Sequence, residues 1–332
     1  MPALDIEEIP TGAALEALAP AWDELWRRAP GATPFHSPAW LLPWWREIGG
    51  GELRVLAARR GGRVVGVLPM YLQDEGGGKL LPLGIAISDY LDGLFEEGCG
   101  REVAEAMLRR LAERHDWRCC ELHPLRKGSP LLDAGTPPGC GDEVVEFEPC
   151  LAVEIPAGAR ALSDVLPRKI RANLRAFRRR AEQAGRISFE TATAATLTEL
   201  LDALFRLHDA RWHQLERSGV LADPAIRRFH RAAAPLLLDA GLLRLHALRL
   251  NGRIIAVMYA LHVRRRAYLY VCGFDPDFAA LSPGTLIFGH TIAHAVGEGA
   301  RVVDFLRGRE RYKYFWGARE RPCYGRMLER VG

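Results

Sequence analysis

One pattern in the sequence occurs twice, and this repeat constrains the fold more than any other feature. The segment LRVLAARRGGRVVGV at residues 53–67 returns without a gap as LRLHALRLNGRIIAV at residues 243–257. Most of the differences exchange one apolar residue for another. Each copy has two apolar runs around a glycine-containing turn, which is the pattern of a β-hairpin.

A helix followed by a strand also returns in each half. Residues 101–115 have apolar side chains at helical spacing and lead into RCCEL at 118–122. Residues 283–298 show the same helical pattern and lead into RVVDF at 301–305. Both halves therefore read strand, strand, variable insert, helix, strand, and this ordered repetition indicates duplication of one structural unit.

The stretch between the two copies predicts a domain boundary. Residues 135–149 are rich in proline and glycine and interrupt the regular apolar spacing. We therefore predict two domains, residues 1–145 and 146–332, which suits a chain of 332 residues. No apolar run approaches the ~20 residues of a membrane-spanning helix, and the first residues form no apolar signal core. We expect no transmembrane segment and a cytoplasmic protein.

A strongly basic helix is expected after this boundary, over residues 167–184. Arg168, Arg171 and Arg175 fall on one face of it, whereas Ile170 and Leu174 fall on another. Such a helix has either a plain solvated face or a platform for anions. The anion could belong to the phosphates of coenzyme A, a sugar nucleotide, tRNA or an anionic lipid.

Lysine is rare in this chain, so we consider Lys313, which lies in the run RYKYFW, as a candidate functional residue. Its aromatic neighbours would desolvate it, which suits a donor to a developing oxyanion or a partner for phosphate. The alternative is a surface lysine whose stem lies along the aromatic rings. Arg307 follows an apolar strand and could bind phosphate or carboxylate, or lie on the surface. Tyr270 and Tyr312 could donate a proton to a leaving thiolate, or only pack.

Two carboxylates lie close together in ISDYLDG, residues 87–93. Asp89 or Asp92 could act as a general base, and the alternative is an ordinary turn-forming aspartate. His290 and His294 are four residues apart on a predicted helix, but the sequence offers no third ligand beside them. We therefore predict no metal site.

Several motifs together resemble those of a known group of enzymes. They are FHSPAWL at 35–41, RKIRANLR at 168–175, the pair Arg211-Trp212, GFDP at 273–276, SPGTL at 282–286, DFLRG at 304–308 and YKYFWG at 312–317. The chain resembles tandem proteins of the acyl-CoA N-acyltransferase (GNAT) fold that are associated with cellulose and exopolysaccharide biosynthesis. It also resembles the related Fem-type aminoacyl transferases.

The resemblance implies an α/β (α+β) fold of two tandem GNAT-like domains, each a mixed, largely antiparallel sheet flanked by helices. It implies an N- or O-acyltransferase that moves an acyl group directly from a thioester to an amine or hydroxyl in a cleft between the halves. Acyl-CoA would be the co-substrate, with no permanently bound cofactor. The acceptor would be a small molecule, a saccharide or a peptide.

The resemblance also assigns roles to individual residues. It favours catalytic roles for Asp89, ahead of Asp92, and for Lys313, and the chemistry of its side chain adds Tyr312 as a third catalytic candidate. Donor binding would fall to Arg168, Arg171, Arg175, Ser282, Gly284 and Thr285. Acceptor binding would fall to His36, Tyr90, Arg211, Trp212, Tyr270 and Arg307.

One motif differs from that of the GNAT fold, and this difference leaves the identity of the acyl donor undecided. A complete acyl-CoA site opens a helix with a glycine-rich loop whose N–H groups meet the pyrophosphate. Here the second half has only SPGT at 282–285, where Pro283 removes one donor, and the first half has only GCGR at 98–101. Another thioester or an aminoacyl-tRNA therefore stays open. A Fem-type tRNA-dependent transferase is the first alternative, although no long heptad pair is present. A degenerate, non-catalytic binding pair is the second.

Overall fold

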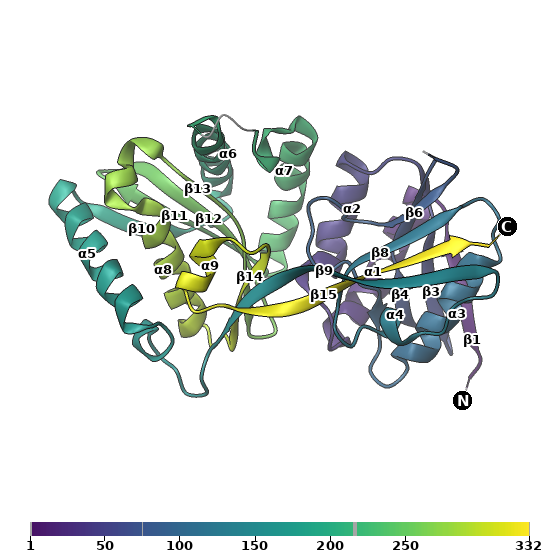
Figure 1. Cartoon of the computed structure of the whole chain (residues 1–332). Coiled ribbons are helices and arrows are strands. Elements are labelled where there is room, and N and C mark those ends of the chain that lie inside the picture. The colour runs from purple at the N-terminus through teal and green to yellow at the C-terminus, as the bar shows by residue number, and fades with distance from the viewer. Residues whose placement is uncertain (1, 75, 215–217, 332) are drawn as a thin grey trace. The chain divides into compact units, whose positions relative to one another are not determined.

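The chain divides into two compact units, which are coloured along the sequence in Figure 1. The computed structural model describes residues 2–74, 76–214 and 218–331. Unit 1 comprises Met1–Glu148 and Pro322–Gly332, and unit 2 comprises Pro149–Arg321.

The expected first boundary, after residue 145, lies close to the end of the first segment of unit 1 at Glu148, and the larger difference is at the C-terminus. The predicted second domain, 146–332, ran to the last residue, whereas residues 322–332 belong to unit 1. They return there because strand β15 (Arg319–Arg330) pairs antiparallel with β8 (Cys119–Arg126) of unit 1. The sequence repeat did not include this final strand.

Unit 1 contains two groups of strands. The first has the order β1-β3-β4-β7, with bounds Leu4–Ile9, Val55–Arg60, Arg63–Leu68 and Leu94–Phe95. The second contains β15, β8, β6 (Lys79–Pro82), β5 (Met70–Gln73) and β2 (Glu52–Leu53). The predicted hairpin of the first repeat is confirmed, because β3 and β4 pair antiparallel with Ala57 opposite Val67.

The helices of unit 1 are α1 (Gly12–Arg28), α2 (Pro38–Glu47), α3 (Gly100–Ala112) and the short α4 (Pro130–Asp133), with a 3-10 turn at Pro34–His36. Helices α1 and α3 pack on the first sheet, whereas α4 packs on α3 and β8. Helix α3 packs closely on β4 because residue 66 is glycine. A Cβ there would lie 2.5 Å from Cγ1 of Val103, so a side chain would push the helix away.

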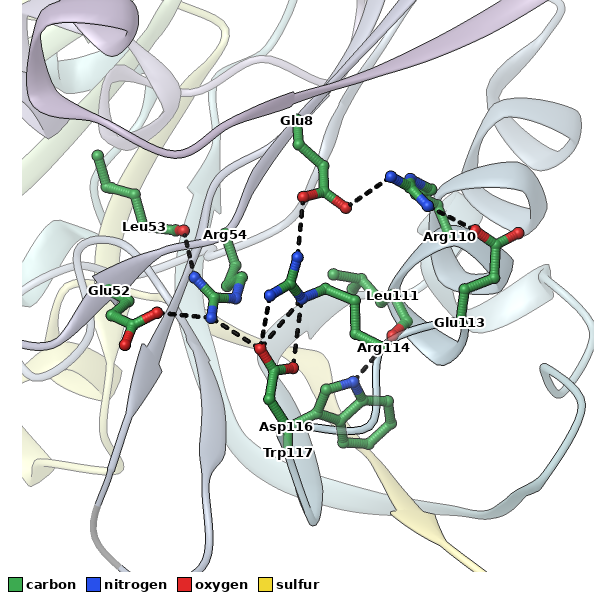
Figure 2. A network of polar contacts seen from close by, with 10 residues as sticks. All are labelled: Glu8, Glu52, Leu53, Arg54, Arg110, Leu111, Glu113, Arg114, Asp116 and Trp117. Atoms are coloured by element: carbon green, nitrogen blue, oxygen red, sulfur yellow. Dashed lines mark hydrogen bonds and ion pairs between the residues drawn. The ribbon is translucent and has the colours of Figure 1, made fainter.

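A network of ion pairs joins β1, the start of β3 and the end of α3 in unit 1 (Figure 2). Asp116 accepts hydrogen bonds from Arg114 (2.7 Å) and from Arg54 (2.8 Å). Glu8 pairs with Arg114 and with Arg110, both at 3.1 Å. The hydrogen bond from Arg114 is the largest cause that lowers the pKa of Asp116, to about 2.

Unit 2 is built on one mixed sheet of order β10-β11-β12-β13-β14-β9. Its strands are β10 (Ile187–Thr191), β11 (Leu243–Leu250), β12 (Arg253–Val263), β13 (Arg266–Phe274), β14 (Val302–Arg307) and β9 (Cys140–Glu154), which starts in unit 1. The second hairpin is confirmed, because β11 and β12 pair antiparallel. These mixed, mostly antiparallel sheets with flanking helices confirm the predicted fold class.

Helices cover both faces of this sheet (Figure 1). They are α5 (Arg168–Ala184), α6 (Leu197–Gln214), α7 (Pro224–Asp239), α8 (Pro283–Gly297) and α9 (Arg311–Phe315). Three 3-10 turns, Leu162–Asp164, Val220–Ala222 and Pro276–Leu281, connect them. Met258 of β12 packs in the same core as Ile287 of α8. The next residue, Tyr259, meets His230 of α7 with ring centroids 5.4 Å apart, so it lies on the opposite face.

Candidate active site

The two parallel strands of unit 2 separate partway along their length. Strands β13 and β14 pair only from Arg266↔Val302 to Tyr268↔Asp304. Beyond these pairs β13 continues to Phe274 and β14 to Arg307. The backbone of β13 beyond Tyr268 is therefore not paired with β14, and an extended ligand could bond to it as an added strand would.

The end of β14 has an unusual backbone conformation. Leu306 has a φ of +61°, and the register between β14 and β9 shifts between Asp304 and Arg307. Asp304 is fully buried and accepts hydrogen bonds from the Leu306 N–H (2.9 Å) and from Arg266 (3.0 Å). These contacts hold the strand end in one position beside the separated strands.

Lys313 is buried at 2% exposure, and its ammonium group bonds to the same strand end. Its Nζ donates to the carbonyl of Leu306 (3.2 Å) and to that of Arg307, and it pairs with Glu310 at 2.9 Å. An ammonium group has three N–H donors. These contacts use all three, so in this arrangement Lys313 supports the backbone at residues 306–307.

Four elements bring side chains together at the open end of β13. The guanidinium of Arg211, from α6, lies 5.0 Å from the ring centroid of Phe274. Tyr312, from α9, packs edge-on against Phe288 of α8, with centroids 5.5 Å apart. Cys272 of β13 lies near both side chains, because Arg211 opposes the rise that burial causes in the pKa of Cys272, and Cys272 adds to the rise that desolvation causes in the pKa of Tyr312. We call Arg211, Cys272, Phe274 and Tyr312 the strand-end cluster.

The acidic groups of this cluster keep their protons at neutral pH. Desolvation raises the pKa of Tyr312, although the residue stays 40% exposed. The charge of Glu310, and that of Cys272 when it is ionised, add to this rise, and Arg211 opposes it. Burial likewise raises the pKa of the Cys272 thiol to about 12. Tyr312 is therefore a neutral phenol that can donate a proton, and Cys272 is a thiol rather than a nucleophilic thiolate.

The N-terminus of α8 lies beside the strand-end cluster. A Cβ on Gly284 would lie 3.2 Å from Cδ1 of Phe274, so the first turn of α8 packs on this ring. Ser282 precedes the helix with a φ of +54°, and Pro283 occupies its first position. The N–H groups of Gly284 and Thr285 belong to the first turn, which has no preceding helical carbonyl to bond. This turn therefore presents N–H groups that suit an anion.

The structure thus brings together part of the predicted site. Ser282, Gly284, Thr285, Arg211 and Tyr312 lie around the open strand end, with Arg307 on the strand that Lys313 supports. Trp212 donates from its indole to Nε2 of His208 (2.9 Å). The ring of Tyr270 lies farther back on β13, against the rings of His230 (5.6 Å) and Tyr259 (5.6 Å).

The three predicted donor-binding arginines of α5 lie elsewhere. Leu174 packs on Gly289, and Arg180 donates to the carbonyl of Ala280 (2.8 Å), so α5 and α8 run antiparallel. Arg171 and Arg175 consequently line a cavity against the middle of α8, and the described lining of this cavity includes no residue of 282–285. Arg168 lies one turn farther from the α8 N-terminus than Arg171.

The remaining predicted residues lie in unit 1. His36 is buried, and its Nε2 accepts a hydrogen bond from the Asp92 N–H (3.2 Å). Tyr90 is buried with a φ of +61°, and the guanidinium of Arg126 lies 5.3 Å from its ring centroid. Asp89 is 8% exposed. Asp92 lines a cavity of about 600 Å³, and Asp89 is not in the described lining of that cavity.

This cavity of unit 1 has a buried carboxyl group in its wall. Asp92 is 5% exposed, and its Oδ1 accepts a hydrogen bond from Ser129 (2.8 Å). Burial raises its pKa to about 6, although Arg126 and the Ser129 hydrogen bond act in the opposite direction. The cavity also reaches Gly98 and Gly100 at the start of α3. The family resemblance placed Asp89 ahead of Asp92, and no local pattern in the sequence indicated which of the two lines the cavity.

Sequence reasoning gave no site role to Cys272, Phe274 or Asp304. Phe274 and Asp304 stood within the motifs GFDP and DFLRG, and that was their only signal. In the described parts of the chain, no three His, Cys, Asp or Glu side chains are arranged to hold a metal ion. The same residues contain no helix that is long and apolar enough to cross a membrane.

Comparison with solved structures identifies this fold. The crystal structure of FemX superposes with a TM-score of 0.64 at 12% identity, covering 99% of this chain and 96% of that one. The C-terminal domain of a putative lysylphosphatidylglycerol synthetase from Agrobacterium fabrum gives 0.61 at 14% identity, with 96% and 92% covered. L-PGS from Bacillus licheniformis gives 0.57 at 12% identity, with 89% and 91% covered. At these identities the likeness concerns the fold.

Comparison of the sequence gives one family match, and it falls on unit 2. No curated protein matches the chain. Residues 168–314 match the acetyltransferase (GNAT) domain. This segment contains the separated strands, α8 and the strand-end cluster. Residues 168–314 are therefore similar to the acetyltransferase (GNAT) domain, and the whole chain has a fold that resembles that of FemX.

Proposed function

We propose that unit 2 transfers an acyl group from a thioester, with acyl-CoA as the donor, to an amine or hydroxyl acceptor. The observation that carries the proposal is the separation of β13 from β14 beyond Tyr268 and Asp304, inside the segment that matches the GNAT domain. The donor would lie along the unpaired edge of β13. Its pyrophosphate would meet the N–H groups at the start of α8 and the guanidinium of Arg211.

The proposed chemical step needs one protein group, which first donates a proton and then accepts one. The acceptor nitrogen or oxygen attacks the thioester carbonyl carbon, and the carbon–sulfur bond breaks. The Tyr312 hydroxyl gives its proton to the leaving thiolate, and the phenolate so formed takes the proton that the acceptor loses. The raised pKa of Tyr312 keeps the phenol protonated before the step. General acid–base help of this kind contributes roughly 10²–10⁴-fold to a rate.

Lys313 would then act as a positioning residue. Its contacts with the carbonyls of Leu306 and Arg307 support this role better than direct contact with the oxyanion. Asp89 lies in unit 1 and has no part in the step written above. Its role as a base remains a prediction, which an Asp89→Asn variant tests.

The deciding experiment is calorimetry of the full chain with acetyl-CoA, with free CoA and with dephospho-CoA. Saturable binding near one to one, weakened at least tenfold by Arg211→Gln, is the expected result. A thiol-release assay with pooled amine and hydroxyl acceptors then measures turnover. Absence of binding to every CoA compound would overturn the CoA donor.

One observation favours a second donor, an aminoacyl-tRNA. FemX and a putative lysylphosphatidylglycerol synthetase share the fold over nearly the whole chain. The exposed arginines of α5 offer charge for a nucleic acid. Filter binding of charged and uncharged tRNA at two salt concentrations tests this donor. The tRNA reading requires binding that weakens steeply with salt.

A further inference from the structure

A cavity of about 380 Å³ lies within unit 2 between α5, β10 and α8. This volume is within the range of small-molecule sites. Most of its wall is apolar, and the apolar lining residues are Leu162, Leu174, Phe189, Leu286, Gly289 and Ala293. A wall of this kind favours an alkyl chain, because it removes apolar surface from water.

Three guanidinium groups stand at the same cavity. Arg171, Arg175 and Arg178 are spaced at i, i+4 and i+7 on α5, so they follow one face of the helix. Arg178 pairs with Glu182 at 2.8 Å in an exposed position. Among the described residues, no carboxylate forms an ion pair with Arg171 or Arg175. Backbone hydrogen bonds lower the pKa of Asp164, and the charge of Arg171 lies near enough to add to this effect without forming an ion pair with it. The cavity therefore combines an apolar wall with an excess of positive charge.

Two buried polar atoms at the cavity lack hydrogen-bond partners among the described residues. They are Nε of Arg171 and Nε2 of His290. The His290 ring is stacked on Phe189, with centroids 4.4 Å apart and an angle of 9°, which fixes its orientation. A buried N–H without a partner is unfavourable. Both atoms are closed to solvent, so a phosphate oxygen in the cavity would reach the outer nitrogens of the Arg171 guanidinium rather than these two.

We propose that this cavity binds one anionic amphiphile, whose alkyl chain lies on the apolar wall and whose phosphate head meets Arg171 and Arg175. Guanidinium groups bind phosphate oxygens through paired, charge-assisted hydrogen bonds. The site is separate from the proposed transfer chemistry. Its described lining contains none of the strand-end cluster and no residue from 282–285.

The first test uses octyl phosphate as the probe, with inorganic phosphate and octanol as its two halves. Calorimetry of the full chain should show saturable binding of octyl phosphate, near one to one. Either half alone should bind at least tenfold more weakly. Octyl phosphate is not a thioester, so this result does not depend on acyl transfer. Equal affinity for octyl phosphate and inorganic phosphate would overturn the proposal, because the cavity would then have no part in binding.

Variants of the protein test the contributions of the phosphate head and of the alkyl chain of octyl phosphate separately. Arg171→Gln should weaken octyl phosphate at least tenfold, whereas Arg179→Gln, the same charge change on an exposed part of α5 outside the lining, should change it less than twofold. Ala293→Leu fills the cavity from an exposed position and should bring the affinity for octyl phosphate down to that for inorganic phosphate. Equal losses in the Arg171 and Arg179 variants would indicate diffuse charge and overturn the site.

A last measurement distinguishes a single bound amphiphile from a membrane surface. Vesicles of phosphatidylglycerol should compete with octyl phosphate only in the variants that retain the cavity. Vesicle binding that is as strong in Ala293→Leu as in the wild type, with no binding of octyl phosphate to either, would replace the proposed site by adsorption of α5 to lipid. Circular dichroism of each variant confirms that it is folded.

Discussion

Asp304 and Lys313 hold opposite sides of one residue, Leu306, at the end of β14. Oδ1 of Asp304 accepts from the Leu306 N–H at 2.9 Å, and Nζ of Lys313 donates to the Leu306 carbonyl at 3.2 Å. The left-handed backbone of Leu306, with a φ of +61°, costs roughly 1–2 kcal/mol for a residue with a side chain. The two contacts stabilise that conformation and so fix where β14 ends beside β13.

The first prediction concerns Lys313→Met. This change keeps most of the side-chain volume but removes the donor from the buried carbonyls of Leu306 and Arg307. Each buried group left without a partner costs about 1–3 kcal/mol. We expect the free energy of unfolding to fall by about 2–4 kcal/mol in urea titrations. Loss of turnover with unchanged unfolding would instead place Lys313 in contact with the substrate.

The second prediction compares two tyrosines of α9. Tyr312→Phe removes the hydroxyl that the proposed step uses, so kcat should fall at least tenfold. Tyr314→Phe removes an exposed hydroxyl that donates to Glu320 at 2.6 Å, and we expect its kcat to stay within twofold of the wild type. The thiol-release assay measures both variants. Equal rates for them would remove Tyr312 from the mechanism.

The repeat was sufficient to predict the shared part of the fold. The hairpins β3–β4 and β11–β12 follow from local apolar patterns around short turns, and such patterns depend on near neighbours only. The return of β15 to unit 1 does not follow from them. It depends on pairing between Cys323 and Arg126, which are far apart in the sequence, and no local signal fixes such a register.

The candidate site was predictable only where one element holds several of its residues. SPGTL at 282–286 begins α8, and this motif placed Ser282, Gly284 and Thr285 together. The sequence could not indicate that α5 packs antiparallel on α8, which places Arg171 and Arg175 at a cavity whose described lining includes Leu286 but none of residues 282–285. It also could not rank Asp92 above Asp89. The side-chain directions in that loop depend on Tyr90, whose φ of +61° breaks any regular alternation.

The third prediction uses the buried carboxyl group of Asp92. Its pKa of about 6 when folded exceeds the ordinary value of 3.8, so the folded chain holds this proton more tightly than the unfolded chain. Between these two values, stability from this group falls as the pH rises. Asp92→Asn lacks this loss and should still accept from Ser129. We therefore expect the variant to gain on the order of 3 kcal/mol over the wild type between pH 4 and pH 7.

Urea titrations of wild type and Asp92→Asn at several pH values check this prediction. Other carboxyl groups titrate in both proteins, so their contributions cancel in the difference between the two curves. Ser129→Ala serves as a control, because it removes the hydrogen bond but keeps the carboxyl group, and its curve should retain the loss above pH 4. A constant difference between Asp92→Asn and wild type across this range would contradict the raised pKa.

The fourth prediction concerns Asp116, whose carboxylate meets Arg114 and Arg54 in Figure 2. Its folded pKa of about 2 lies below the ordinary 3.8, so its contribution to stability is present above pH 3.8 and is lost as the pH falls through 2. The side chain is 35% exposed, so solvent screening reduces the contribution. Asp116→Asn should lower the free energy of unfolding by about 1 kcal/mol at pH 7.

The control for Asp116 is Asp23→Asn, which breaks an exposed pair with Arg27 within α1. Such pairs contribute roughly 0.3–0.5 kcal/mol, so the unfolding curve of this variant should nearly overlie that of the wild type. Asp116 differs because two guanidinium groups from separate segments, Arg54 and Arg114, share its carboxylate. In 1 M NaCl the Asp116→Asn difference should shrink, since salt screens a partly exposed pair. A difference that is unchanged by salt would mean that the short-range hydrogen bonds to the carboxylate, rather than charge attraction that salt can screen, hold these segments together.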